Sequence, residues 1–180
     1  MDGGHTVYDA FAELLRYPDA GFGRCIDDCR QVPGGLPPEA EQLLAAFAAA
    51  VEHLSVGELE ELYTSTFDLD PLSSLELGWH LFGENYSRGE FLVAMRQTLR
   101  RLGLEETTEL PDHLTHVLRA LGRMGPAEAD RFCTNYVLPA LEKMQAGLSG
   151  KNCPFEHVLA ALRDVILSPC GAVLAEVNHG

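Results

Sequence analysis

Histidine and cysteine are the first candidates for chemistry in this chain of 180 residues, because both side chains ligate metals and take part in catalysis. Cys25 and Cys29 are about one helical turn apart, and so are His113 and His116. Neither pair has a second pair nearby, and the other cysteines and histidines are scattered. A structural metal needs three or four converging ligands. The spacing therefore predicts free thiols and imidazoles, with no bound metal.

Enzymatic chemistry has no support in the residue pattern. A nucleophilic serine or cysteine needs an adjacent base, and a phosphate-binding loop needs a glycine-rich turn between a strand and a helix. The glycines at 21, 23, 34 and 35 follow no strand-like segment. Asp68 and Asp70 lie close together, but such acids are typical of helix caps or solvated groups. We expect no catalytic residues.

Two segments carry an unusual mixture of aromatic and polar residues. The first surrounds a loop between Leu62 and Gly89 and contains Tyr63, Phe67, Trp79, His80, Phe82, Tyr86 and Arg88. Aromatic rings beside an acidic loop can form a groove for a peptide with apolar and cationic side chains. Core packing is the alternative for about half of these residues, and we expect it for Phe67 and Phe82.

The second segment, 110–114, places Asp112 and His113 at an expected helix start. A peptide site could use both side chains. The alternative is that Asp112 stabilises the positive end of the helix while His113 is exposed.

Helices must position these residues, because apolar side chains recur at intervals of three and four and no alternating strand pattern is present. We predict an all-α fold, a single-domain helical bundle. The expected helices cover 7–15, 24–30, 39–54, 55–67, 75–82, 87–102, 111–121, 126–144 and 154–167.

Local signals mark several helix boundaries. Capping boxes are predicted at Ser55 and Ser87, each with a glutamate three residues later. Gly103 is placed to end a helix, and Pro111 to open one. Pro139 lies inside a helical pattern and predicts a kink or a break. No repeat or linker divides the chain, so we expect one domain over 1–180, with a weakly held tail from about residue 170.

Charge and cysteine content restrict the partners and the compartment. Lys and Arg number 13 against 27 Asp and Glu, which gives a formal net charge of −14. This charge disfavours nucleic acids and anionic membrane surfaces and favours cationic partners, although acidity for solubility alone is an alternative. The longest apolar run, 43–51, is far shorter than the roughly 20 residues of a membrane span. With no export signal and no Cys-x-x-Cys pair, the sequence predicts a cytoplasmic protein.

Four segments in order resemble one family. They are 61–68 (ELYTSTFD), the spaced pattern through Ser74, His80 and Gly83 that continues into 87–89, the segment 109–114 (ELPDHL), and the early Leu14-x-x-Tyr17-Pro18. Together they resemble the NarJ branch of the TorD/DmsD family of molybdoenzyme-maturation chaperones. Glu76 and Trp79 depart from the family pattern, and the end after Lys151 matches nothing in it.

The resemblance implies a cytoplasmic helical chaperone that makes and breaks no bond. Such proteins bind the N-terminal segment of a molybdoenzyme catalytic subunit, a twin-arginine signal or its remnant. The usual client is respiratory nitrate reductase. They hold the apoprotein until its bis-molybdopterin guanine dinucleotide is inserted, before membrane docking or export, and hold no permanent cofactor themselves.

Carried over by position, the expected client-peptide contacts are Tyr63, Phe67, His80, Arg88, Asp112 and His113. We expect Asp112 to pair with a client cation, the two histidines to hydrogen-bond, and Tyr63 to supply apolar wall. Arg88 is expected to brace the loop through Asp68 or Asp70, because it would repel a cationic peptide.

Two other classes of function stay open on the sequence. A permanent structural subunit of an oxidoreductase complex would also explain a helical fold with free cysteines. An enzyme or nucleotide-binding protein would need a phosphate loop that the chain lacks. The loop from Asp68 to Ser74 is a candidate hinge for helix exchange in a homodimer.

Overall fold

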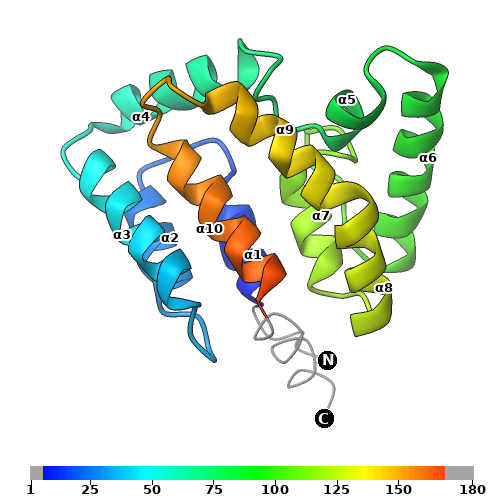
Figure 1. Cartoon of the computed structure of the whole chain (residues 1–180), viewed down its shortest axis with the longest axis horizontal. Helices are drawn as coiled ribbons and strands as arrows, with labels where there is room; N and C mark the ends of the chain where they lie inside the picture. The colour runs from blue at the N-terminus through cyan, green and yellow to red at the C-terminus, as the bar shows by residue number, and fades with distance from the viewer. Residues whose placement is uncertain (1–5, 169–180) are drawn as a thin grey trace.

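The computed structural model describes residues 6–168, which form helices joined by short loops (Figure 1). The all-helical prediction is confirmed: this part of the chain has no β-strand, only one isolated antiparallel bridge between Glu76 and His113. In chain order the elements are α1 (Val7–Leu14), α2 (Phe22–Arg30), α3 (Pro38–Val51), α4 (Val56–Tyr63), the π-helical turn η1 (Thr64–Asp68), α5 (Leu77–Phe82), α6 (Tyr86–Arg101), α7 (Leu114–Leu121), α8 (Pro126–Phe132), the π-helical turn η2 (Cys133–Val137), α9 (Leu138–Leu148) and α10 (Phe155–Leu167).

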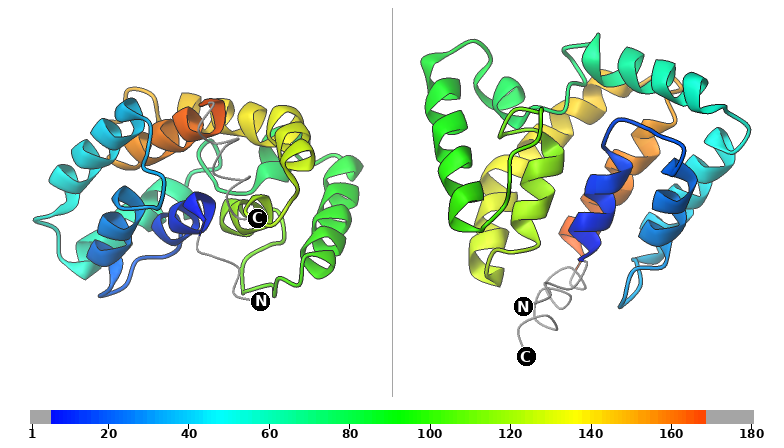
Figure 2. Two further views of the ribbon diagram at one scale, coloured as in Figure 1. Left: turned by 90° about the horizontal axis from the view of Figure 1, so that it is seen from below. Right: turned by 180° about the vertical axis from the view of Figure 1, so that it is seen from behind.

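Three helices lie at the centre of the molecule. Almost every residue of α1 and α7 is buried, and α10 buries a broad stripe from Phe155 to Val165. Helix α10 packs against α3 and α9, while α1 packs against α2 and α7 (Figures 1 and 2). Helices α1 and α7 therefore join the group formed by α1–α3 and α10 to the group formed by α5–α9.

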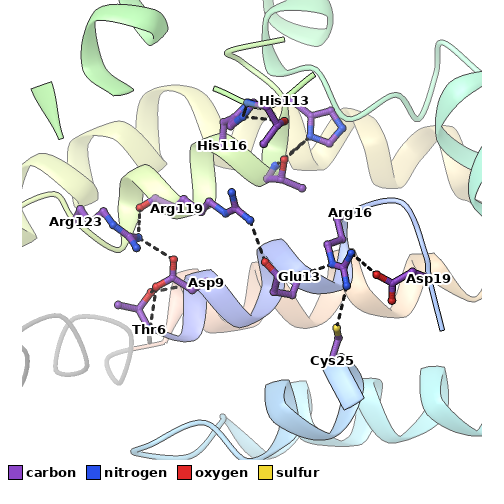
Figure 3. A network of polar contacts seen from close by, with 12 residues as sticks. Thr6, Asp9, Glu13, Arg16, Asp19, Cys25, His113, His116, Arg119 and Arg123 are labelled. Atoms are coloured by element: carbon purple, nitrogen blue, oxygen red, sulfur yellow. Dashed lines mark hydrogen bonds and ion pairs between the residues drawn. The ribbon is translucent and has the colours of Figure 1, made fainter. Parts of the chain in front are cut away.

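Polar contacts fix the packing of α1 against α7. Arg119 donates to Glu13 at 3.0 Å and Arg123 donates to Asp9 at 2.8 Å (Figure 3). Thr6 caps α1, because its hydroxyl accepts from the Asp9 amide and its own amide donates to the Asp9 carboxylate. The Asp9 carboxylate thus serves both the start of α1 and the contact with α7.

The helix-boundary predictions have mixed outcomes. The capping box at Ser55 is confirmed, and Gly103 has the positive φ of 68° expected just beyond α6. The second capping box is wrong, because Asn85 caps α6 and accepts from the Ser87 amide, which lies inside the helix. The prediction for Pro111 is also wrong: α7 begins at Leu114.

The expected disturbance at Pro139 takes the form of a π turn. Proline has no N–H to donate, so it cannot complete a regular α-helical ladder. The chain passes from α8 through η2, where the Leu138 amide donates to Cys133, into α9. The predicted tail from about 170 lies outside the described residues.

Candidate functional site

Tyr63 and Phe67 lie within a cluster of aromatic rings. Tyr63 is 5.1 Å from Phe67 and 5.9 Å from Phe155 between ring centroids, and Tyr17 packs on its outer side at 5.4 Å. The Tyr63 hydroxyl donates to the carbonyl of Leu15 at 2.9 Å. Burial, followed by the charges of nearby acids, raises the pKa of this hydroxyl well above its ordinary value. Both predicted contact residues are buried, and core packing of Phe67 is confirmed.

His80 connects α5 to the preceding loop and to α9. Its Nε2 lies 2.7 Å from the carbonyl oxygen of Ser74, and its own carbonyl accepts from the Lys143 ammonium at 2.6 Å. Burial is the main cause that lowers the pKa of His80. The side chain is buried, so both polar contacts serve to hold α5 in place.

Asp112 is fully buried beneath the start of α5. Its Oδ2 accepts from the Gly78 amide at 2.7 Å, while Oδ1 has no hydrogen-bond partner. Burial raises the pKa of this carboxyl above its usual value, against the opposing effects of the Gly78 hydrogen bond and of Arg88. Gly78 is required here, because a Cβ on it would lie 2.7 Å from Asp112 Oδ2.

Arg88 does not form the expected pair with Asp68 or Asp70. Its guanidinium carbon lies 5.5 Å from the ring centroid of Trp79, which is a cation–π contact. Asp70 pairs instead with Lys151. The reason is positional: Arg88 belongs to the first turn of α6, beside α5, where Trp79 and the charge of Asp112 are its neighbours.

His113 is the N-cap of α7 rather than an exposed residue. Its Nδ1 lies 2.8 Å from the Thr115 hydroxyl and accepts from the Thr115 amide at 3.3 Å. The backbone on either side pairs with the 75–77 segment, where Leu77 donates to Asp112 and Leu114 donates to Leu75. Burial, and secondarily His116, lowers the pKa of His113 to about 4. The imidazole is therefore neutral near pH 7.

Three carboxylates gather beside these buried residues: Asp68, Glu76 and Glu109. Burial and the charge of Glu76 raise the pKa of Asp68, although a hydrogen bond from Thr64 opposes them. Burial, Glu76 and Asp68 raise the pKa of Glu109 in that order, opposed by His116. Within residues 6–168, no lysine or arginine forms an ion pair with any of the three. We call this group the acid trio.

An open groove of about 400 Å³ lies on the other side of Tyr63. It is formed where the turn after α1 meets α4 and η1, and its lining residues are Tyr17, Gly57, Glu60, Glu61, Thr64, Ser65 and Leu69. Leu69 directly follows Asp68, so the groove and the acid trio adjoin. The groove combines exposed apolar side chains with two glutamates.

Most of the predicted contact residues are buried, whereas the exposed residues around them were not predicted. Tyr63, Phe67, His80, Asp112 and His113 are all buried and held by other parts of the chain. The exposed neighbours Tyr17, Leu69 and Glu109 were not among the predicted contacts. A sequence signal for Leu69 does exist. It is an apolar residue in a predicted loop, outside the helical spacing that marks core positions, and such a residue is expected to be exposed.

Comparison with known proteins identifies the family. The sequence profile of the nitrate reductase delta subunit family matches residues 34–159. The chain belongs to this family. The match includes the acid trio and every groove residue except Tyr17, and it confirms the resemblance seen in the motifs. No individual curated protein matches the chain.

Membership in the nitrate reductase delta subunit family supports an assembly role in molybdoenzyme maturation, not catalysis. It also implies interaction with a nitrate reductase catalytic subunit. Among the described residues, no helix has the length and apolar character that a bilayer crossing requires.

Proposed function

We propose that this protein is a cytoplasmic maturation chaperone that binds the N-terminal segment of a molybdoenzyme catalytic subunit, with nitrate reductase as the leading candidate. The observation that carries the proposal is the groove lined by the exposed apolar residues Tyr17 and Leu69 together with Glu60 and Glu61, next to the acid trio. A segment with apolar and cationic side chains matches this surface.

The apolar part of the surface supports peptide binding. Leu69 is 74% exposed, Leu72 62% and Tyr17 48%, although each belongs to a segment that packs closely elsewhere. Large apolar side chains exposed together mark interaction sites. Covering one such leucine stabilises a complex by about 1.5–3 kcal/mol, less the cost of ordering the peptide.

The negative charge of the surface favours cationic side chains in the bound segment. Glu60 and Glu61 line the groove, and the acid trio lies beyond Leu69. A client arginine or lysine would offset the negative charges that help to raise the pKa of Asp68 and of Glu109. The net charge of −14 adds a long-range attraction that salt screens.

The loop that carries Leu69 and Leu72 is anchored before any client arrives. Ser73 donates to the Thr66 carbonyl, and the Trp79 indole donates to the Pro71 carbonyl at 2.8 Å. Lys151 pairs with Asp70. A pre-formed surface lowers the ordering cost of binding.

The six residues predicted from the motifs have a supporting role in this proposal. Tyr63 packs against the groove residue Tyr17, Phe67 packs against Tyr63, and His80 holds α5. Asp112 and His113 hold the loop before α7, and Arg88 packs over Trp79. Direct contact between these side chains and a client would require α5 and the 110–113 segment to separate. While the segment is bound, the client stays accessible for insertion of its molybdenum cofactor.

Calorimetric titration with the N-terminal peptide of the nitrate reductase catalytic subunit tests the proposal. We expect saturable binding that weakens about tenfold in Leu69→Ala, because about 1.4 kcal/mol of apolar contact is lost. Val93→Ala is the matched control, since Val93 is also exposed but lies on α6. Failure of the parent to bind, or equal weakening in the control, contradicts the proposal.

A charge variant tests the second feature of the groove. Glu60→Gln/Glu61→Gln should weaken binding at low salt, and the difference from the parent should shrink as salt rises. Glu39→Gln/Glu41→Gln, on the exposed start of α3, removes the same charge at a distance from the groove. An equal effect in this control would show that net charge alone attracts the client. Retention of the protein in the finished enzyme at one copy per complex would favour a permanent subunit instead.

A further inference from the structure

We propose that Glu76, Glu109 and His113 form a binding site for a divalent transition-metal ion of the Zn²⁺ type. The three side chains come from separate segments, and their ligand atoms all lie within 4.8 Å of one another. The argument for this site uses no peptide, but Glu76 and Glu109 also belong to the acid trio, so an ion here and a client cation would compete for the same carboxylates.

A buried imidazole distinguishes this cluster from an ordinary patch of surface acids. The His113 side chain is 6% exposed, and its Nε2 makes no hydrogen bond. The nearest charged atom to Nε2 is Oε2 of Glu109, at 4.0 Å. Nε2 faces this carboxylate, so an ion placed between them would be held by imidazole and carboxylate together.

The ring is already oriented by its second nitrogen. Nδ1 lies 2.8 Å from the Thr115 hydroxyl, which can accept a hydrogen bond as well as donate one. The N-cap hydrogen bond from the Thr115 amide needs a lone pair on Nδ1 and so places the proton on Nε2. Metal binding would shift that proton to Nδ1, which would then donate to the Thr115 hydroxyl and leave the Nε2 lone pair for the metal. Metal-bound histidines commonly use such an outer hydrogen bond to fix the tautomer and the ring. The Thr115 amide, at the longer distance of 3.3 Å, would lose its contact.

The backbone brings the ligands together. The antiparallel bridge pairs Glu76 directly with His113, and the Leu114 amide donates to Leu75 at 2.8 Å. Glu109 stands four residues before His113, in a turn closed by the bond from the His113 amide to Leu110. Main-chain hydrogen bonds thus hold the backbone of Glu76 and His113 in place. Glu109 is exposed, and its side chain can adjust its position.

Electrostatics also favour a cation at this position. The two carboxylates carry like charge and repel each other at this short range. Among residues 6–168, neither glutamate has a lysine or arginine partner. One dication would offset both carboxylates.

The ligand set determines the class of ion. Two carboxylate oxygens and one imidazole nitrogen suit Zn²⁺, Co²⁺ or Mn²⁺, whereas Mg²⁺ and Ca²⁺ prefer oxygen alone. Zinc binds nitrogen and oxygen at about 2.0–2.2 Å, so its ligand atoms lie no more than about 4.2 Å apart. The ligand atoms, now within 4.8 Å of one another, would therefore have to move closer by side-chain rotation, and water would complete the coordination.

Titration of the untagged full chain with Co²⁺ and Zn²⁺ alone tests the proposal. We expect one ion per chain by calorimetry, and a visible Co²⁺ spectrum without a thiolate-to-cobalt charge-transfer band. Affinity should fall at least tenfold in Glu109→Gln and in His113→Asn. Asparagine keeps an N-cap for α7, and Glu109 is exposed, so both variants should fold, which thermal unfolding checks. Glu105→Gln is the matched control.

Three results would overturn the proposal: no saturable binding, a thiolate band that accounts for the bound ion, or unchanged affinity in both ligand variants. A further comparison separates the two roles of this region. Loss of peptide binding in Glu109→Gln with no metal binding by the parent would assign the cluster to the client alone. Metal binding by a parent that fails to bind peptide would support the metal site and remove the client role.

Discussion

At the scale of single residues, Tyr63 connects the groove to the core. Its hydroxyl holds the carbonyl of Leu15 at the end of α1, and its ring separates exposed Tyr17 from buried Phe155. A tyrosine can do both because one end is apolar and the other forms hydrogen bonds. Position 63 therefore affects stability directly and client binding only through Tyr17.

Tyr63→Phe removes the hydroxyl and leaves the Leu15 carbonyl buried without this donor. We expect the free energy of unfolding to fall by about 1–2 kcal/mol, while peptide affinity stays within about twofold of the parent. Urea unfolding followed by circular dichroism measures the first, and calorimetry the second. Tyr86→Phe is the control, because Tyr86 is 82% exposed and should change neither. A large loss of affinity with unchanged stability would show that Tyr63 itself contacts the client.

Asp112 shows why residue roles could not be predicted from the motif. Because Asp112 precedes a helix, its carboxylate is expected either to stabilise the positive N-terminal end of that helix or to bind a ligand. In the structure, Asp112 accepts a hydrogen bond from the amide of Gly78, which lies 34 residues earlier. A local sequence motif cannot indicate a contact between residues so far apart in the chain. Removing Asp112 would leave the Gly78 amide unpaired in the interior. A loss of client binding in Asp112→Ala would therefore report disturbed folding as readily as a lost contact.

At the scale of elements, α9 and the loop from η1 to α5 meet at a glycine. A Cβ on Gly147 would lie 2.1 Å from the carbonyl oxygen of Leu72, which no side chain tolerates. The loop lies directly on the helix backbone here. The position of Leu72, and of Leu69 before it, depends on this close approach.

Gly147→Ala should displace the loop or separate it from α9, with a loss of about 1–3 kcal/mol in the free energy of unfolding. Gly89→Ala is the matched control: Gly89 lies inside α6 with open space around it, and alanine there should raise stability by about 0.5–1 kcal/mol. Thermal or urea unfolding of both variants checks the opposite signs. Equal stability of Gly147→Ala and the parent would contradict the contact.

Helix existence could be predicted from periodicity, whereas several boundaries could not. The stripes of α3 and α10 are strong because one face of each is buried, whereas α1 and α7 are buried on almost all sides. The start of α6 was misplaced because Asn85 and Ser87 are both good caps, and only one of them has the extended backbone of an N-cap. Pro139 signals the disturbance at η2, although not its π form, whereas no such residue marks the π turn η1.

At the scale of the whole molecule, the packing of α1 on α7 joins two groups of helices. Asp9 is buried there, and Arg123 holds it. Burial alone would raise the pKa of Asp9, but hydrogen bonds from Arg123 and Thr6 outweigh it and keep the pKa below the ordinary value. The ionised carboxylate therefore stabilises the fold.

Arg123→Ala should lower the free energy of unfolding by about 1–3 kcal/mol near pH 7. The depressed pKa of Asp9 contributes stability that is present above the unfolded pKa and lost as pH falls through the folded pKa. The difference between parent and variant should therefore shrink in acid, which urea unfolding at several pH values measures. Arg131→Ala, on exposed α8, should show no such difference. If the difference in unfolding free energy between the parent and Arg123→Ala stays constant across pH, the ionisation of Asp9 does not account for the effect.

The acid trio could not be predicted because it is a product of the whole fold. Asp68, Glu76 and Glu109 are separated in sequence and surrounded by other acids in a chain of charge −14. Charge counting shows only an excess of acid. Their proximity depends on how the 75–77 segment pairs with the segment before α7.

That pairing also sets when the cluster comes into existence. Residues 76 and 113 meet through a bridge that closes a loop of more than 30 residues, and loop closure of this kind must await the folding of the elements between its ends. During synthesis, Glu76 leaves the ribosome well before His113 does. A nascent chain that has not yet exposed His113 therefore presents scattered acids, and the cluster exists only once the 75–77 segment has paired with the segment before α7.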